Sequence, residues 1–327
     1  MKRPREEGSK VTVIVKDGLR IVEPYQFEFS CHAKARWLGR DVLEVCAKEF
    51  IAYPPEHYVD AAETGELRVV SRAGGSDYAG GGRILQSNDL VVHCAQVKEN
   101  PVPAIPLHIV FENDQLVAIN KPNGWPAHPC GNYRHNSVTE AMKIERKDLS
   151  LAPLHRIDRL TSGILLLAKT AAAARAGQAL AGDGTAEKLY VARVSGKLEA
   201  GFRVEEPIAC IDAKLGKYAV RSDGKWSVTE FEVLETGEFE SLLLCKPLTG
   251  RTHQIRVHLQ HVGHPIVNDE CYGGFYDAKH PHAFPRIKGS TVDHCTGIFL
   301  HAWKYKIPGL VEVETTLPDW ANKKVSD

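Results

Sequence analysis

The chain has 327 residues, of which 43% are hydrophobic and 25% are charged, and 41 basic residues balance 41 acidic ones. This composition is typical of a globular protein with one or two domains and a substantial core. Because the formal net charge is zero, indiscriminate nucleic-acid binding by an overall basic surface is excluded, although a local basic cleft still acts through its own field. No apolar run reaches the roughly 18–20 residues of a membrane helix, so we expect no membrane span.

The N-terminus and the cysteines bear on the compartment. The sequence begins MKRPREE, which is charged and has no apolar stretch, unlike a secretory signal. The eight cysteines are scattered and none forms a C-x-x-C pair, as is typical of thiols in a reducing compartment. We therefore expect a cytoplasmic protein, with the nucleus and the mitochondrion as alternatives.

Composition divides the chain into four parts. Residues 1–30 combine a polar leader with an edge strand and an extended stretch near Pro24, which predicts an arm rather than a domain. The proline-rich residues 99–106 predict a stiff linker. This linker separates a small module at 31–98 from a larger domain at 107–327.

The small module combines predicted helices with predicted strands. The apolar spacing after Asp41 predicts a helix that Asp41 caps. Pro55 can open a second helix, because a missing N–H costs little at that position, and Gly65 can close it. Two strands and a flexible glycine-rich loop are predicted in the rest of the module, at residues 67–70, 89–92 and 74–82.

In the larger domain, strands alternate with a few helices, which indicates an α+β fold. The predicted strands lie at residues 116–119, 164–168, 189–194, 231–234 and 241–245. An alanine-rich helix is predicted at 171–180. A second helix is predicted at 252–262, because Gly263 and Pro265 form a standard helix stop just beyond it.

Residues 155–163 (HRIDRLTSG) place several charges directly before a fully apolar strand. Asp158 lies between Arg156 and Arg159, and nearby positive charge favours the ionised form of a carboxylate. An ionised carboxylate at the mouth of a strand can act as a nucleophile or as an electrostatic stabiliser. The alternative is a salt-bridged surface loop, and residue types alone slightly favour that interpretation.

Two further segments contain polar groups suited to binding. Residues 247–258 (PLTGRTHQIRVH) concentrate cations and amide donors at a predicted helix start, where free N–H groups suit a phosphate or a carboxylate. The alternative for this segment is a solvated helix face. Residues 120–124 (NKPNG) leave a predicted buried strand, and taken alone they indicate only a turn.

Four histidines raise the alternative of a metal-dependent hydrolase, namely His253, His258, His261 and His264. However, Gly263 ends the predicted helix before the last of them, and no acidic or cysteine partner is near until residues 269–271. A deaminase centre would need H-x-E and P-C-x-x-C, and neither occurs. Phosphate-cradle and hydrolase-elbow motifs are absent too, so we expect neither a metal nor a cofactor.

Considered together and in order, these segments resemble the motifs of RluA-type RNA pseudouridine synthases. Residues 155–163 resemble the catalytic motif of that family, with Ile157 in place of the commoner leucine. The other matching segments lie at residues 120–122 with 128–129, 188–192, 249–258, 263–269 with 272–273, and 300–302. The resemblance covers residues 107–310, and agreement of so many segments in order makes a chance match negligible.

The resemblance implies a mixed, mainly antiparallel sheet flanked by helices and loops, preceded by a small S4-like RNA-binding module at 31–98. It also implies an enzyme that isomerises uridine to pseudouridine in RNA without a cofactor. That reaction breaks the N1–C1′ bond, turns the detached uracil and rejoins it through C5. One carboxylate suffices for it.

Roles for single residues follow from the same resemblance. Asp158 is the catalytic carboxylate, and Arg256 pairs with it, in keeping with the need of a buried carboxylate for a cation. Tyr190 stacks on the uracil, Ile255 floors the pocket, and Arg156 fills the gap that the flipped base leaves. Phosphate contacts are expected from Lys121, Arg134, Arg159 and Arg251, with a solvated surface role as the alternative for each.

The subfamily and the partner are predicted from finer matches. Residues 128–131, 133–137 and 22–25 look like those of eukaryotic members that modify uridine 32 in the tRNA anticodon loop, and Asn268 fits that branch. We therefore expect a monomer that acts on tRNA, with ribosomal RNA as the alternative substrate. An RNA-binding protein that has lost catalysis is an alternative from a second class of function. Its sequence would not need to keep the catalytic candidates Asp158, Tyr190 and Arg256 together, so their presence argues against it.

Overall fold

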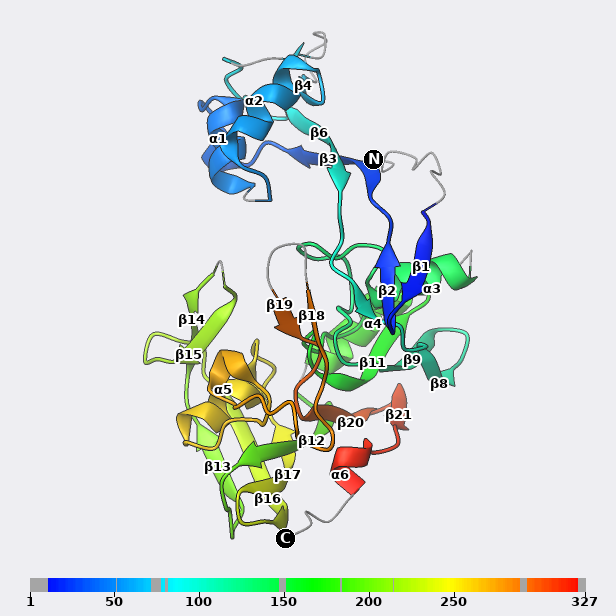
Figure 1. Ribbon diagram of the computed structural model, residues 1–327, viewed down its shortest axis with the longest axis vertical. Coiled ribbons are helices and arrows are strands. Elements are labelled where there is room, and N and C mark those ends of the chain that lie inside the picture. Colours follow the sequence, from blue (N-terminus) through cyan, green and yellow to red (C-terminus); the bar gives the residue numbers. More distant parts are fainter. Residues whose placement is uncertain are drawn as a thin grey trace. The chain divides into compact units, whose positions relative to one another are not determined.

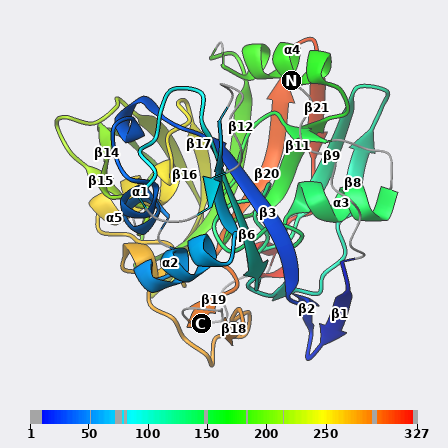
Figure 2. The same cartoon turned by 90° about the horizontal axis from the view of Figure 1, so that it is seen from above.

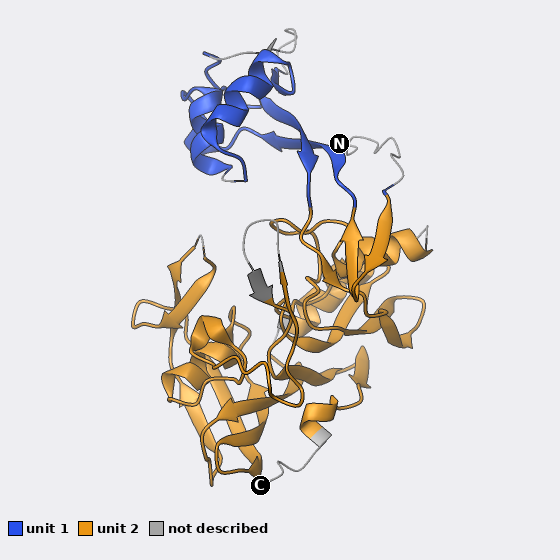
Figure 3. Cartoon of the chain, in the orientation of Figure 1, with its two compact units in different colours: residues 1–11, 23–98 blue, residues 12–22, 99–327 orange. Residues whose placement is uncertain are grey.

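The structure is a computed structural model, and it describes residues 11–50, 52–71, 78–79, 82–146, 151–182, 184–213, 215–288 and 293–322. The chain forms two compact units, one of residues 1–11 and 23–98 and the other of residues 12–22 and 99–327 (Figures 1 and 3). Most of the glycine-rich loop predicted at 74–82 lies outside the described residues. Within the described part of the chain, no helix is long and apolar enough to cross a membrane.

The first unit packs helices on one face of a sheet with strand order β3-β6-β4-β5. Its elements are β3 (Tyr25–His32), η1 (Ala35–Trp37), α1 (Val42–Glu49), α2 (Pro55–Glu63), β4 (Leu67–Val70), β5 (Tyr78–Ala79) and β6 (Leu90–Val97). Asp41 caps α1, as predicted, because its carboxylate accepts from the backbone N–H groups of Leu43 and Glu44. The predicted helices and strands of this unit are confirmed, and the S4-like similarity stays a prediction.

The second unit is built on a ten-stranded sheet (Figures 1 and 2). The path runs β13-β16-β17-β12-β20-β11-β9-β8, with β10 paired to β11 and β21 to β20. The strands are β8 (His108–Glu112), β9 (Leu116–Lys121), β10 (Ala152–Pro153), β11 (Ser162–Ala168), β12 (Glu187–Ser195), β13 (Phe202–Glu205), β16 (Val228–Thr236), β17 (Glu240–Pro247), β20 (Leu300–Ile307) and β21 (Val311–Glu314). The β11–β20 pair is parallel and the other described pairs of this sheet are antiparallel, so the predicted α+β class is confirmed.

Helices and short strand pairs complete the second unit. They are β1 (Val13–Lys16), β2 (Leu19–Val22), β7 (Val102–Pro103), α3 (Val138–Arg146), α4 (Ala171–Gly182), β14 (Ile208–Asp212), β15 (Lys217–Val220), α5 (Gln254–His261), η2 (Glu270–Tyr272), β18 (Arg286–Lys288), β19 (Asp293–Cys295) and α6 (Asp319–Asn322). Residues 13–22, which the sequence places in an arm, form the hairpin β1–β2. This hairpin pairs with β7 and therefore belongs to the second unit.

The buried strand β11 organises the core around the site. Its side chains alternate between two hydrophobic clusters: Ile164 packs in the cluster that includes residues of α4, and Leu165 in the cluster that includes residues of α3. Both faces of the sheet are therefore covered at this strand. At its start, Gly163 has φ +106°, and a Cβ there would lie 2.2 Å from the Ala302 carbonyl oxygen of β20. Only glycine allows this close approach, which fixes where the preceding loop leaves the sheet.

Candidate active site

The loop between β10 and β11 carries Asp158, and the side chain of Lys121 holds this loop by a hydrogen bond to the Arg159 carbonyl oxygen. This lysine ends β9 and has no exposed surface. Its Nζ donates to the carbonyl oxygens of Pro122 (3.0 Å), Trp125 (2.7 Å) and Arg159 (3.1 Å). Because an ammonium has three N–H groups, all of its donors are used, and one of them holds the residue next to Asp158.

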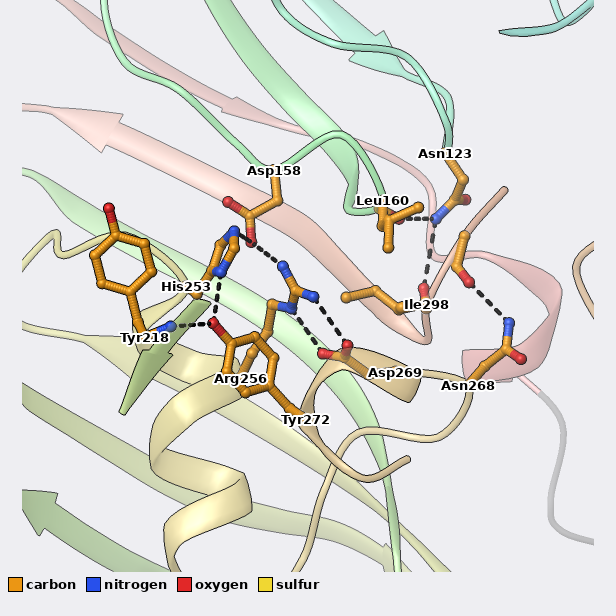
Figure 4. A network of polar contacts seen from close by, with 11 residues as sticks. Asn123, Asp158, Leu160, Tyr218, His253, Arg256, Asn268, Asp269, Tyr272 and Ile298 are labelled. Carbon is orange, nitrogen blue, oxygen red and sulfur yellow. Dashed lines mark hydrogen bonds and ion pairs between the residues drawn. The ribbon is translucent and has the colours of Figure 1, made fainter. Parts of the chain in front are cut away.

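The Asp158 carboxylate is held on one side only. Its Oδ2 accepts from Nη1 of Arg256 at 3.1 Å and lies 3.8 Å from Nε2 of His253, and the side chain is 25% exposed (Figure 4). Burial raises the pKa of Asp158, but His253 and Arg256 outweigh it and hold that pKa below the usual value. Oδ1 has no hydrogen-bond or ion-pair partner among the described residues. The site thus presents an ionised carboxylate with one free oxygen.

Arg256 of α5 is oriented by a second carboxylate. Its Nε and Nη2 donate to the two oxygens of Asp269 at 2.7 Å and 2.9 Å, and both side chains are buried. Its guanidinium also lies over the ring of Tyr272, 4.8 Å from the centroid. Burial alone lowers the pKa of Arg256, but Asp269 and Asp158 raise it, so the guanidinium stays charged. A bidentate pair of this kind fixes the plane of the guanidinium and so the direction of Nη1, which donates to Asp158.

His253 and Tyr272 form a second support for the same carboxylate oxygen. His253 precedes α5 in a left-handed conformation, with φ 57°, and its Nδ1 lies 2.7 Å from the hydroxyl of Tyr272. The same hydroxyl accepts from the backbone N–H of Tyr218 at 3.1 Å (Figure 4). The predicted helix therefore begins at Gln254, two residues later than expected, because His253 turns its side chain toward Asp158 instead of extending the helix.

A cleft of about 520 Å³ lies beside this carboxylate, within the roughly 300–1,000 Å³ typical of ligand sites. Its lining includes Asp158, Arg256, Ile255 and Tyr190. Tyr190 is half-buried on β12, next to an irregularity in the pairing of β12 with β20. Burial, with smaller contributions from Tyr305 and Asp158, raises the pKa of Tyr190, so its hydroxyl keeps its proton at neutral pH. An aromatic face, a neutral hydroxyl and a charged carboxylate thus border one space.

Comparisons with known proteins place the chain in a family. The family model described as RNA pseudouridylate synthase matches residues 115–261, which contain Asp158, Tyr190 and Arg256. Pseudouridylate synthase RPUSD2 of Mus musculus is 41% identical over 82% of this chain and 48% of that protein. Two proteins of Saccharomyces cerevisiae also match. The tRNA pseudouridine(32) synthase, mitochondrial, is 34% identical over 82% of this chain and 58% of that protein. The tRNA pseudouridine(31) synthase is 30% identical over 95% of this chain and 97% of that protein.

The chain belongs to the RNA pseudouridylate synthase family. The resemblance predicted from the motifs is thereby confirmed. The solved structure of Human RNA Pseudouridylate Synthase Domain Containing 1 has the same fold over 65% of this chain and 84% of that one, with a TM-score of 0.52 and 27% identity. The chain spans about half the length of the mouse and human RPUSD2 proteins that it matches.

Within this synthase fold, most of the predicted site residues line one cleft. They are Asp158, Tyr190, Arg256, Ile255, Arg156, Arg159 and Arg251. Arg156 is exposed at the cleft, Arg159 lies over the ring of Tyr133 at 5.5 Å, and the Nε of Arg251 donates to the Trp226 carbonyl at 3.3 Å. All three cations thus remain candidates for RNA contacts.

Lys121 and Arg134 are not part of the cleft lining. The predicted phosphate contact of Lys121 is corrected here, because the side chain is fully buried and its three N–H groups serve backbone carbonyls. Its position supports the Asp158 loop instead. The backbone N–H of Arg134 donates to the Glu99 carboxylate at 2.9 Å, and Arg134 is not among the residues that line the cleft.

The clustered histidines have separate structural contacts. His258 is buried, with Nδ1 2.9 Å from the Thr229 hydroxyl and Nε2 3.2 Å from the Glu206 carbonyl oxygen, and His264 contacts the Ser195 carbonyl at 2.9 Å. No metal-binding group of three or more His, Cys, Asp or Glu side chains occurs in the part of the chain that the structure describes. Both ring nitrogens of His258 thus have hydrogen-bond partners within the fold, so this histidine does not offer a free nitrogen to a metal.

Sequence reasoning missed the roles of His253, Asp269 and Tyr272. It considered His253 and Asp269 only as metal ligands or as parts of a matched segment. A signal was available for Asp269, since a buried arginine has five N–H donors, more than the Asp158 carboxylate alone can accept, so a second acceptor is expected beside it. No sequence signal indicated that Tyr272 would contact both His253 and Arg256.

Proposed function

We propose that the protein isomerises uridine to pseudouridine in RNA, with Asp158 as the catalytic carboxylate and no cofactor. One observation carries the proposal: Asp158 is ionised, held through Oδ2 by Arg256, and has its Oδ1 free beside the cleft. This oxygen borders the same cleft as Tyr190 and Ile255, which a salt bridge on an open surface would not do. The match to RNA pseudouridylate synthases over residues 115–261 supports this reaction, and one carboxylate is sufficient for it.

The reaction conserves every atom of the nucleotide. The N1–C1′ bond breaks, the freed uracil turns, a C5–C1′ bond forms, and the proton on C5 is removed while N1 gains one. Positive charge develops at C1′ as the first bond breaks, and the free oxygen of Asp158 can stabilise it or attack it. Arg256 keeps this carboxylate ionised and fixes its direction, so little reorganisation is needed at the moment of reaction.

Tyr190 and Ile255 are assigned to the base. A uridine reaches the cleft only by leaving its stack, which costs a few kcal/mol. An aromatic face recovers roughly 1–3 kcal/mol by stacking on the base, and Ile255 is buried at the same cleft. The neutral hydroxyl of Tyr190 is suited to proton movement at C5. We assign Arg156, which is exposed at the cleft, to the gap that the flipped base leaves in the RNA.

The experiment on Asp158 compares two isosteric changes. Asp158→Asn removes the charge with little change of shape, and Asp223→Asn makes the same change at an exposed site whose carboxylate, among the described residues, pairs with Arg221. Each protein is incubated with total RNA, pseudouridine is mapped at single-nucleotide resolution, and RNA binding is measured separately. Asp158→Asn should bind RNA and convert none of it, while Asp223→Asn should match the unaltered chain. Conversion by Asp158→Asn would disprove the assignment. Binding without conversion by the unaltered chain would favour the RNA-binding alternative.

We infer that the substrate is tRNA and that the target is uridine 32 of the anticodon loop. Both yeast relatives carry tRNA in their names, one with position 32 and the other with position 31. Unstacked loop bases are also the usual targets of sequence-specific RNA recognition. Transcripts with cytidine at position 32 or at position 31 separate these sites. Loss of modification only with cytidine 32 supports the inference, and modification of ribosomal RNA instead would overturn it.

We propose further that a cytoplasmic monomer performs the reaction. Among the described residues, one chain brings Asp158, Tyr190 and Arg256 together at the cleft. Light scattering of the purified chain tests the oligomeric state. Cell fractionation tests the compartment, and recovery from mitochondria would place the protein with its yeast relative whose name includes that organelle.

A further inference from the structure

The hydroxyl of Tyr272 has a proton that must find an acceptor. Tyr272 is 1% exposed, so solvent does not reach the group. Its oxygen accepts from the backbone N–H of Tyr218 at 3.1 Å, and Nδ1 of His253 lies 2.7 Å away. Because Tyr218 supplies a donor, only the ring nitrogen of His253 is left to accept the hydroxyl proton among the described contacts. A buried O–H without an acceptor is costly, so Nδ1 must carry a lone pair.

The lone pair on Nδ1 fixes the state of the whole ring. A neutral imidazole has one N–H and one acceptor nitrogen, so the proton of His253 resides on Nε2. Nε2 is the nitrogen that faces Asp158, 3.8 Å from Oδ2 (Figure 4). This separation is longer than a hydrogen bond, and such contacts commonly shorten when the substrate arrives. The left-handed backbone at His253 keeps the ring between Tyr272 and Asp158.

We propose that His253 is a positioning residue: Tyr272 holds it as the neutral Nε2–H tautomer, and its N–H keeps Oδ2 of Asp158 turned away from the substrate so that Oδ1 faces C1′. The proposal deepens the proposed function and rests on it. Tyr272 supports both groups that face Oδ2, since its hydroxyl fixes His253 and its ring lies under Arg256. One buried tyrosine thus sets the direction of the carboxylate.

The charged and titratable groups around His253 make the arrangement sensitive to acid. Asp158 faces the ring from its loop, Arg256 from α5, Asp269 and Tyr272 from the η2 region, and Tyr218 from β15. Burial lowers the pKa of His253, although Asp158 acts in the opposite direction. Protonation puts a second N–H on Nδ1, against a hydroxyl that already accepts from Tyr218. The hydroxyl proton then loses its acceptor, so the imidazolium breaks the support that the neutral ring provides.

Four variants separate the parts of this support. His253→Asn accommodates the left-handed backbone but does not reach Asp158, whereas His253→Gln carries an amide N–H to about the position of Nε2. Tyr272→Phe removes the proton donated to Nδ1 and keeps the ring under Arg256. His261→Asn on the exposed side of α5 is the matched control. Steady-state conversion of tRNA gives kcat and KM for each variant across pH 5–9.

The expected pattern is specific to positioning. His253→Asn should lose roughly tenfold in kcat with little change in KM, and His253→Gln should recover most of that loss. Tyr272→Phe should move the acid limb of the pH profile upward, because the neutral ring loses the hydrogen bond that stabilises it. His261→Asn should match the unaltered chain. Unchanged kcat in His253→Asn, or no recovery in His253→Gln, would overturn the proposal.

Two spectroscopic measurements decide the inference without activity. The ¹⁵N shifts of His253, assigned by their loss in His253→Asn, should show the Nε2–H tautomer at pH 7, and an Nδ1–H tautomer would overturn the assignment. The ¹³C shift of the Asp158 carboxyl at pH 7, where His253 is neutral, should change in His253→Asn and not in His261→Asn. If the unaltered chain converts no uridine, the proposed function fails, while these two readouts still show whether His253 holds Asp158.

Discussion

Asp158 and Asp89 lie in different units of the chain, and both pair with an arginine, but they differ in how many carboxylate oxygens are engaged. Asp89 is 1% exposed, and both of its oxygens accept: Nη2 of Arg83 lies 3.4 Å and 3.1 Å from them, and the Gln86 N–H donates to one at 2.9 Å. Asp158 is 25% exposed and uses only Oδ2. Asp89 thus has both carboxylate oxygens engaged within its own unit, whereas Asp158 keeps Oδ1 unengaged beside the cleft.

The comparison also concerns the arginines. Among the described residues, Arg83 has one carboxylate partner, whereas Arg256 is held by Asp269 through two hydrogen bonds and also donates to Asp158. An arginine that is already fixed contributes direction as well as charge. An aspartate paired with an arginine is therefore found both in fold-stabilising and in catalytic ion pairs. What distinguishes Arg256 is the second carboxylate, Asp269, that holds it.

The largest expected effect separates the two aspartates by activity. Asp158→Asn should reduce conversion at least about 1000-fold, because the charge that stabilises or attacks C1′ is gone. Asp89→Asn should leave conversion per folded molecule unchanged, but lower the free energy of unfolding by about 1.5–3 kcal/mol, since a hydrogen-bonded charge is lost beside Arg83. Chemical denaturation and single-turnover assays on the same preparations check both. Equal loss of activity in the two variants would remove the distinction.

The next effect tests the support behind Arg256. Asp269→Asn leaves the buried guanidinium with one carboxylate, and breaking a buried pair costs roughly 3–5 kcal/mol. Asp269→Asn should therefore unfold at a markedly lower denaturant concentration than the unaltered chain, and the kcat of its folded fraction should fall. The exposed pair of Arg286 with Glu270 is a matched control: Glu270→Gln should change stability by less than about 1 kcal/mol. Normal stability in Asp269→Asn would contradict this account of Arg256.

The fold class and part of the candidate site could be predicted from the sequence, because they depend on local patterns and ordered motifs. Periodicity and caps are local, so the helix capped by Asp41 and the buried strand at 164–168 were found. Ordered motifs identified Asp158, Tyr190 and Arg256, and the three border one cleft. Lys121 was misassigned, because a cation in sequence does not reveal whether three carbonyls will surround it. The link from Tyr272 to His253 depends on packing between distant segments, which no local pattern encodes.

A smaller effect should appear in the acid stability of the chain. The folded pKa of Asp158 lies below its unfolded value, which is about 3.9. Its contribution to stability is therefore present above that unfolded pKa and is lost as the pH falls through the folded one. Denaturant unfolding of the unaltered chain and of Asp158→Asn between about pH 2.5 and 7 gives the difference between their free energies of unfolding at each pH. The unaltered chain should lose stability relative to the variant below about pH 4. A constant difference would mean that Asp158 has an ordinary pKa.

The smallest expected effect contrasts two cations that looked alike in sequence. Arg251 is exposed at the cleft, whereas Lys121 is buried against three carbonyls. Arg251→Gln should raise KM for RNA a few-fold and reduce the slope of log K against log salt by about 1, because one phosphate contact is lost. Lys121→Met should leave that slope unchanged and instead lower stability, since three buried carbonyls lose their donor. Binding measured at several salt concentrations distinguishes the two. A reduced slope in Lys121→Met would return this lysine to the RNA contacts, and an unchanged slope in Arg251→Gln would remove the arginine from them.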